Sequence, residues 1–270
     1  MSTNPAILKS IPVRLAKWFT AFFAALQFLT IIPPLVKRPF SAQEVGKSVT
    51  FFPAVGLMIG AVLIVADSLL AYILPSAVST VFVLIIWVLI SGALHIDGFL
   101  DTCDGLFGGH SAESRLKIMR DERIGAFALT GGILLMLLKF SSLNSLSVFR
   151  FNALLLAPTL SRWSMVVAIF LFPYARSQGL GRLLKDQVKW SYVLIASAFT
   201  LALAWFVDGW IGIGMFLVSA LLTVGIAIFS LKRIPGLTGD IYGAMNELTE
   251  VFMLVAVVVS SNMDISTFWL

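Results

Sequence analysis

Three aspartates lie within eight positions in the segment HIDGFLDTCDGLFGG, residues 95–109. On a helix that advances 100° per residue, Asp97, Asp101 and Asp104 fall within about 60° of one another. Three carboxylates on one face repel one another unless a cation lies among them, and such oxygen ligands suit Mg²⁺ or Mn²⁺. The spacing therefore predicts a divalent-metal site. The alternative interpretation is that these aspartates are only solvated residues beyond the end of a helix.

A second acidic stretch, PGLTGDIYGAMNELTE, ends at Glu250. Asp240 and Glu247 are seven positions apart and nearly co-facial on a helix, and Gly243 lies between them on the same face. We expect Asp240 and Glu247 to be further metal ligands, and Gly243 and Asn246 to contact a substrate. Two carboxylate faces can hold a pair of ions about 4 Å apart, which clamps a phosphoryl or diphosphate centre. Read alone, the stretch also fits the start of an ordinary amphipathic helix.

Basic side chains suited to an anionic ligand follow the first motif. The segment RLKIMRDERIGAF contains Arg120 and Arg123 beside Asp121, and we expect these three residues to contact the substrate. The same cations are also typical anchors at the cytoplasmic surface of a membrane. Gly108 continues the arc of aspartates and leaves room for a phosphate or a sugar. Arg176, in the segment YARSQGLG, is a further candidate for phosphate binding.

Arg162 lies near the middle of an apolar segment, where a charge is costly and normally faces a cavity or an acidic partner. Two interpretations stay open: Arg162 pairs with Asp67, the other charge within an apolar run, or it stabilises a ligand phosphate during catalysis. The two histidines of the sequence, His95 and His110, offer no Ser-His-Asp arrangement, and the single cysteine excludes an internal disulfide.

The composition indicates which elements must position these residues. Of 270 residues, 59% are apolar and only 12% are charged, with a mean hydropathy of +0.97, whereas soluble proteins carry about 25% charged residues. We predict an all-α, polytopic membrane bundle that forms a single domain over residues 1–270. About 20 apolar residues span a bilayer, and the segments close to that length are 52–74, 78–95, 124–140, 150–172, 191–207, 210–231 and 248–262.

The distribution of Lys and Arg predicts the orientation of this bundle. An eighth apolar segment, 15–34, would place basic loops on both sides of the membrane if all eight segments crossed, which is unfavourable. We therefore expect about seven crossings plus a re-entrant or interfacial helix at 15–34. An outward N-terminus with a crossing segment 15–34 would give the same result, but the basic residues there argue against it. Both acidic stretches then face the cytoplasm, and only Lys139, Arg150 and Arg162 depart from the pattern.

Five ordered segments resemble the signature segments of one enzyme family, cobalamin synthase, also called adenosylcobinamide-GDP ribazoletransferase. They are HIDGFLDTCDGLFGG, SRLKIMRDERIGAFA, LSRW, YARSQGLG and GLTGDIYGAMNELTE. The segments ALQFLTIIP and FFPAVGLMIGA resemble its N-terminal part, so the resemblance covers nearly the whole chain. Members often read HLDGLADTADG at the first motif. Here Phe99, Leu100 and Cys103 replace smaller or different residues, but all three aspartates stand.

The resemblance implies an enzyme of late vitamin B12 synthesis in the bacterial inner membrane, with a site facing the cytoplasm. It implies that adenosylcobinamide-GDP is joined to α-ribazole or its 5′-phosphate, that GMP is released and that Mg²⁺ is required. On this hypothesis Asp97, Asp101 and Asp104 hold one or two Mg²⁺ ions across the diphosphate. Arg162 and Arg123 would stabilise the developing negative charge. We expect the lipid bilayer and the two substrates as partners, consider a homo-oligomer, and expect no nucleic acid.

Three other classes of membrane protein fit these residues less well. A CDP-alcohol phosphotransferase also releases a nucleotide from a diphosphate, but its motif continues with Ala-Arg where this chain has Leu106 and Phe107. A cation transporter would distribute its charges through the depth of the membrane. A structural scaffold would leave two co-facial acidic helices unexplained.

Overall fold

The computed structural model describes residues 13–262, and this part of the chain is helical apart from its connections. The predicted all-α class is therefore confirmed. The helices, in chain order, are α1 (Val13–Leu29), α2 (Ala42–Ser48), the short 3-10 helix η2 (Val49–Phe51), α3 (Phe52–Ala71), α4 (Ser76–Ile90), α5 (Leu94–Gly108), α6 (Ala112–Ile118), α7 (Ala126–Ser145), α8 (Arg150–Leu171), α9 (Leu180–Gln187), α10 (Trp190–Leu231) and α11 (Gly239–Asn262).

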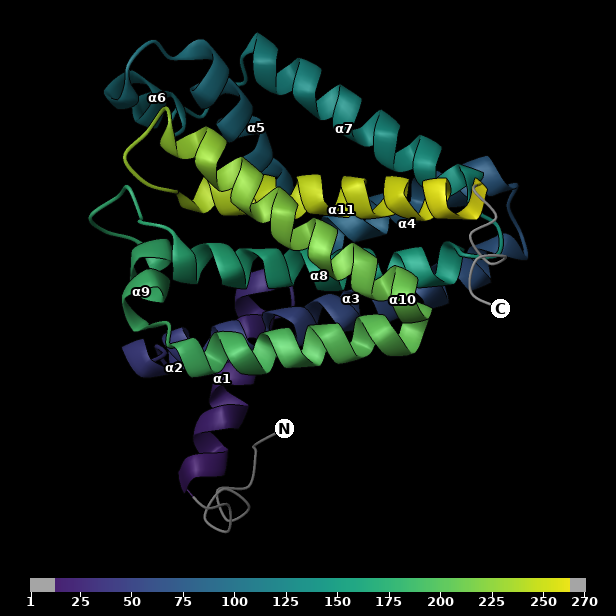
Figure 1. Ribbon diagram of the computed structural model, residues 1–270, viewed down its shortest axis with the longest axis horizontal. Helices are drawn as coiled ribbons and strands as arrows, with labels where there is room; N and C mark the ends of the chain where they lie inside the picture. Colours follow the sequence, from purple (N-terminus) through teal and green to yellow (C-terminus); the bar gives the residue numbers. More distant parts are fainter. Residues whose placement is uncertain (1–12, 263–270) are drawn as a thin grey trace.

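Several of these helices are long and apolar enough to cross a membrane. Five segments in the described part meet that condition, namely 42–71, which contains α3, and the helices α7, α8, α10 and α11. The pair α4 and α5 forms a sixth if its 88° bend belongs to one broken span. Asp208 and Gly209 have non-helical backbone angles inside α10, and the two halves of α10 fold back on each other (Figure 1). Counting these halves separately gives about seven passes, as the sequence predicted.

The bend between α4 and α5 has a local cause. Gly92 and Ala93 both adopt left-handed backbone angles, with φ of 60° and 57°. Two consecutive residues in that region cannot continue a right-handed helix. The chain therefore turns, and α5 starts at Leu94 with the first aspartate already in its first turn.

α8 lies at the centre of the bundle. It packs against α3, α10 and α11, while α5 packs against α7 and α11. In Figure 1, α1 runs across the direction of these helices and lies at one side of the bundle. Among the described residues, α1 is not one of the helices long and apolar enough to cross, and the re-entrant or interfacial placement of segment 15–34 stays a prediction.

One end of the bundle collects the polar connections. The loops after α5, after α8 and after α10 all lie at the end drawn on the left in Figure 1, together with α6 and α9. These loops carry the basic clusters at 115–123, 176–189 and 232–233. Asp97 lies in the first turn of α5 and Asp240 in the first turn of α11, on either side of the contact between these two helices. The fold therefore brings the two acidic stretches to the same end of the bundle, as the distribution of Lys and Arg in the sequence predicted.

Candidate active site

Three cavities adjoin one another at the polar end of the bundle. The largest, which we call the loop cavity, has a volume of about 910 Å³ and is lined by residues of 113–123 and 175–177. The aspartate cavity, of about 310 Å³, is lined by Asp97, Asp101 and Asp104 together with the loop 120–124. The inner cavity, of about 250 Å³, extends between α5, α8, α9 and α11. The loop and aspartate cavities share the residues 120–123, and Arg176 lines both the loop cavity and the inner cavity.

The three aspartates of α5 line one cavity but have different surroundings. Asp104 accepts hydrogen bonds from the backbone amides of Gly125 at 2.6 Å and Ala128 at 2.9 Å. These amides belong to the start of α7, which has no capping side chain at the preceding residue, so Asp104 caps that helix. Asp97 and Asp101 have no hydrogen-bond or ion-pair partner in the described part of the chain. The two free carboxylates are therefore the ones available to a ligand.

Asp240 reaches the same region from α11. Its carboxylate accepts hydrogen bonds from Arg176 at 2.6 Å and from the hydroxyl of Thr238 at 3.2 Å. Arg176 also donates to the carbonyl of Met119, with a separation of 3.4 Å. Arg176 thereby connects the loop after α8 to both acidic segments of the site.

The close contact of α5 with α11 depends on two glycines. A Cβ atom on Gly98 would lie 2.8 Å from the carbonyl oxygen of Asp240, and one on Gly243 would lie 2.9 Å from that of His95. Such distances are too short for any other residue, so the two glycines allow the helices to approach. Gly243, expected from the sequence to contact a substrate, is thus buried in a helix contact. Gly108 is the exposed last residue of α5.

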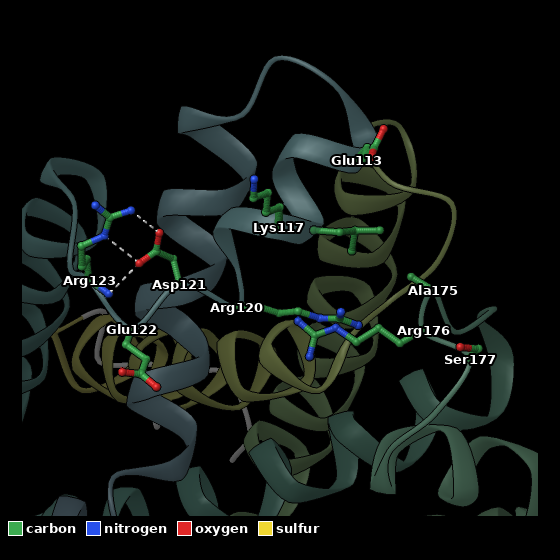
Figure 2. A pocket seen from close by; sticks show the side chains of 10 residues that line it. Glu113, Lys117, Arg120, Asp121, Glu122, Arg123, Ala175, Arg176 and Ser177 are labelled. Carbon is green, nitrogen blue, oxygen red and sulfur yellow. Dashed lines mark hydrogen bonds and ion pairs between the residues drawn. The ribbon is translucent and has the colours of Figure 1, made fainter.

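The residues 120–123, between α6 and α7, form part of the wall of the loop cavity (Figure 2), and we call this segment the basic loop. Arg123 donates to both carboxylate oxygens of Asp121, at 2.9 and 2.6 Å. The hydrogen bonds from Arg123 hold the pKa of Asp121 at about 2. Arg120 and Arg176 extend toward each other in Figure 2, and Arg120 has no ion-pair partner among the described residues. Two guanidinium groups facing one cavity are an arrangement suited to phosphate.

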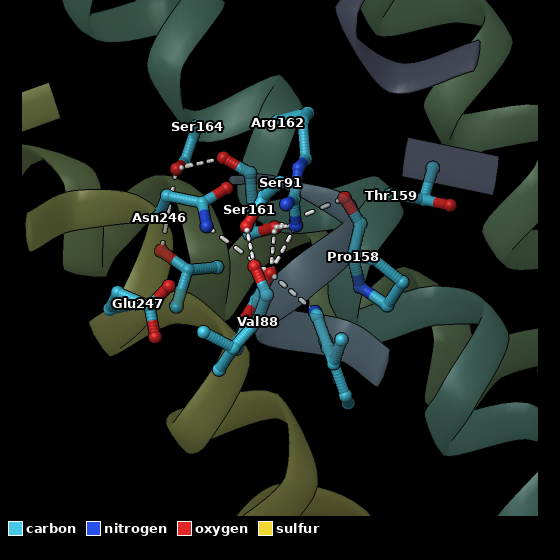
Figure 3. A network of polar contacts seen from close by, with 12 residues as sticks. Val88, Ser91, Pro158, Thr159, Ser161, Arg162, Ser164, Asn246 and Glu247 are labelled. Atoms are coloured by element: carbon cyan, nitrogen blue, oxygen red, sulfur yellow. Dashed lines mark hydrogen bonds and ion pairs between the residues drawn. The ribbon is translucent and has the colours of Figure 1, made fainter. Parts of the chain in front are cut away.

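Arg162 lies in a buried polar network at the centre of the bundle (Figure 3). It donates to Glu250, which also accepts hydrogen bonds from Lys139 of α7, from the indole of Trp87 and from Asn246. The suggested pairing of Arg162 with Asp67 is wrong, because Asp67 pairs with Arg150 at 2.7 and 2.8 Å.

Glu247 belongs to the same network, since its carboxylate lies 2.6 Å from the Nζ atom of Lys139. The network therefore contains two cations and two carboxylates, and all four side chains are almost fully buried. Opposite charges removed from water need this mutual pairing. Glu247 and Asn246 consequently face the bundle interior and not the free carboxylates of α5.

Comparison with known proteins places the chain in a family. Residues 21–258 match the family model described as cobalamin-5-phosphate synthase. The chain belongs to the cobalamin-5-phosphate synthase family. The predicted resemblance is confirmed, and with it an enzyme of the transferase class that acts in the last stage of cobalamin synthesis.

Curated relatives of this family member carry the name adenosylcobinamide-GDP ribazoletransferase. The protein of Geotalea daltonii is 36% identical over 237 residues, which cover 88% of this chain and 96% of the relative. That of Pseudomonas syringae pv. syringae is 37% identical over 239 residues, covering 87% and 97%. That of Desulfitobacterium hafniense is 35% identical over 241 residues, covering 86% and 93%. No solved structure matches the chain.

Sequence reasoning on this synthase-family chain did not identify the buried network as one unit. The signal was present, since Lys139 and Arg162 are charges inside apolar segments and therefore require buried partners. Their partner Glu250 lies in the second acidic stretch, where a metal or substrate role was considered. The sequence pattern alone could not show whether the carboxylate of Glu250 pairs with a cation from a neighbouring helix or with a metal ion.

Proposed function

We propose that this chain joins adenosylcobinamide-GDP to α-ribazole or to its 5′-phosphate and releases GMP. In this reaction a ribose hydroxyl of the ribazole other than its 5′ position loses its proton and forms a bond with the phosphorus attached to the corrinoid arm, so that a 5′-phosphate on the acceptor is carried unchanged into the product. The bond from that phosphorus to the GMP oxygen breaks, and the product is adenosylcobalamin or its 5′-phosphate. The observation that carries the proposal is the placement of Asp97 and Asp101, which have no partner among the described residues, in a cavity that shares the wall residues 120–123 with the one lined by Arg120 and Arg176.

The arginines provide the site for the diphosphate. Arg120 and Arg123 line the two cavities that share the basic loop, and Arg176 faces the loop cavity from the opposite side. Asp240 and the carbonyl of Met119 fix the direction of the Arg176 side chain. A positioned guanidinium stabilises the charge that develops on the phosphoryl oxygens and on the departing phosphate. These residues therefore bind and orient the donor substrate.

A magnesium ion fits this site through fewer protein ligands than the sequence suggested. In the described residues, no group of three or more His, Cys, Asp or Glu side chains is arranged to hold a metal. Mg²⁺ is usually bound by one or two carboxylates together with substrate phosphates, and Asp97 and Asp101 meet that need. Bound there, the ion would neutralise charge on the diphosphate. Asp104, Asp240 and Glu247 instead have protein partners.

Arg162 and Asn246 support the site indirectly in this proposal. Arg162 of α8 donates to Glu250 of α11 and thereby holds the two helices together, while Asn246 donates to the same carboxylate from within α11. α11 in turn positions Asp240 beside α5. We therefore assign Arg162, Asn246 and Glu247 a positioning role, in place of direct contact with the phosphates.

We further propose that the polar end faces the cytoplasm from the bacterial inner membrane. The basic residues of the loops at this end support that orientation, because Lys and Arg are enriched in cytoplasmic loops. The test of the activity is GMP release by the purified protein with both substrates and Mg²⁺. Omission of either substrate should abolish GMP release, whereas release of GMP from the donor alone would indicate a hydrolase.

A further inference from the structure

The inner cavity differs in character from the two cavities that adjoin it. Its wall is largely apolar and includes Phe28 of α1, Met165 and Ile169 of α8 and Leu184 of α9. Tyr174 and Tyr242 stack there with ring centroids 6.0 Å apart and planes inclined by 26°. With a volume of about 250 Å³, it is smaller than the ~300–1,000 Å³ typical of sites for drug-sized ligands. A flat ring system of one or two rings fits such a space, and a corrin macrocycle does not.

Two residues that line this cavity each carry a buried side-chain polar atom without a partner in the described part of the chain. The side chain of His95 is 1% exposed and that of Tyr242 is 3% exposed. Neither the Nε2 atom of His95 nor the hydroxyl of Tyr242 has a hydrogen-bond partner in the described part of the chain. A buried polar group without a partner is costly and rare in native proteins. Since both residues line the cavity, a ligand bound there is the partner that we assign to these atoms.

The position of the cavity shows where such a ligand would continue. Arg176 lines both the inner cavity and the loop cavity, and Asp97 lines both the inner cavity and the aspartate cavity. A ligand with its ring in the inner cavity would therefore present its other end to Arg176 and to the free carboxylates. A nucleoside has this form, with an aromatic base at one end and the hydroxyls of its ribose at the other.

The geometry points to the inner cavity as the binding site for the base of the acceptor nucleoside. This inference rests on the proposed function, in which the acceptor is α-ribazole, a riboside of dimethylbenzimidazole. The apolar wall and the tyrosine rings match a methylated bicyclic base. The free ring nitrogen of that base accepts a hydrogen bond from His95 or Tyr242. The ribose of the acceptor then lies at Arg176, which also lines the loop cavity that we assign to the donor.

Guanine, the base of the donor, has the same bicyclic shape but a different set of polar atoms. Its edge carries several donors and acceptors, whereas the apolar residues of the inner cavity would leave most of them unpaired. The wide and charged loop cavity suits the guanosine and diphosphate of the donor better. The inner cavity is accordingly assigned to the acceptor.

Equilibrium binding of labelled α-ribazole to the full-length protein in detergent, with no donor substrate present, tests this assignment. Tyr242→Phe and His95→Leu remove the two unpartnered atoms. At least one of them, the one that removes the donor to the ring nitrogen, should raise the Kd for α-ribazole about tenfold, the effect of one buried hydrogen bond. Leu180→Trp, at the exposed rim of the cavity, should weaken binding by occupying its volume. Tyr72→Phe and His110→Leu, at exposed positions that line none of the three cavities, are the matched controls and should leave the Kd unchanged.

A change in the ligand separates direct contact from an indirect effect on folding. An indole riboside lacks the free ring nitrogen, so it should bind the native protein about tenfold more weakly. Its Kd should also be insensitive to the substitution that weakens binding of α-ribazole. If all three site variants keep the native Kd for α-ribazole while the native protein turns over, the assignment is overturned and the proposed function stands. If they weaken GDP binding instead, the cavity holds guanine. A folded native protein that neither binds α-ribazole nor releases GMP would overturn the proposed function itself.

Discussion

Asp104 on α5 holds the start of α7, because its two carboxylate oxygens lie 2.6 Å from the backbone nitrogen of Gly125 and 2.9 Å from that of Ala128. The three aspartates of one motif therefore divide between two tasks. Asp104 fixes the basic loop between α6 and α7 relative to α5, while Asp97 and Asp101 face the cavity without partners.

Asp104→Ala should destabilise the protein by about 0.5–2 kcal/mol, the usual cost of a lost helix cap. The backbone amides of Gly125 and Ala128 would lose their acceptor. Asp97→Ala should leave the free energy of unfolding nearly unchanged, since Asp97 bonds to no described residue. Denaturant unfolding in detergent measures both. Equal stability of the two variants would contradict the capping role.

Lys139→Met should destabilise the bundle by about 3–5 kcal/mol, because it leaves a buried carboxylate without its cation. Lys139 lies within hydrogen-bonding distance of both Glu247 and Glu250. The double variant Lys139→Met with Glu247→Met should regain most of that loss, since Glu250 keeps Arg162 as its partner. Thermal unfolding of the two variants is the measurement, and the absence of any recovery would argue against a charge-balanced network.

Gly98→Ala and Gly243→Ala should each destabilise the contact between α5 and α11 by about 1–3 kcal/mol, as overpacking does. Their added methyl groups would lie within 3 Å of a backbone oxygen of the opposite helix. Gly225→Ala is the matched control, because nothing lies within 4 Å of its added methyl group. Unfolding midpoints that are equal for all three variants would show that the helices can separate at no cost.

Arg120→Ala should weaken binding of the GDP-linked donor about tenfold or more, the effect of losing a hydrogen bond to a charged group. Stability should hardly change, because Arg120 has no ion-pair partner in the described part of the chain. Arg182→Ala serves as the control, since Arg182 pairs with Asp186 at 2.9 Å outside the three cavities. Dissociation constants for GDP decide the matter, and equal values for the two variants would remove Arg120 from the phosphate site.

Asp121 should not contribute to the pH dependence of activity near neutrality. Arg123 lowers the pKa of Asp121 to about 2, so the ion pair is complete above the unfolded pKa and is lost only as the pH falls through about 2. Asp121→Asn should therefore leave the limbs of the profile of kcat/KM against pH in place between about pH 5 and pH 9. A limb that moves in this variant would show that Asp121 titrates in the working range.

Long apolar runs made most of the fold predictable from the sequence. The segments 150–172 and 52–74 agree with α8 and α3 to within a few residues. The interruption of the helix that we expected between the segments 191–207 and 210–231 occurs at Asp208 and Gly209. The sharp turn at Gly92 and Ala93 could not be foreseen, because the left-handed angle of an alanine depends on how the surrounding helices pack.

The partners of individual charges were less predictable than their positions. Helical periodicity correctly put Asp97, Asp101 and Asp104 on one cavity wall. It could not show that Asp104 meets the backbone of α7, since that contact joins residues more than 20 positions apart. Nor could it match Glu250 with Lys139 and Arg162, because three different helices supply them. Tertiary packing alone decides such pairings.

The central claim is that Asp97 and Asp101 bind the metal–diphosphate unit of the donor. The most direct measurement is the rate of GMP release from adenosylcobinamide-GDP and α-ribazole 5′-phosphate as a function of Mg²⁺, for the native protein, Asp97→Asn, Asp101→Asn and the control Asp186→Asn. The account predicts Mg²⁺-dependent turnover that each of the first two substitutions lowers at least about 100-fold, with unchanged unfolding midpoints and a normal control. Turnover within twofold of the native rate in both aspartate variants would contradict it.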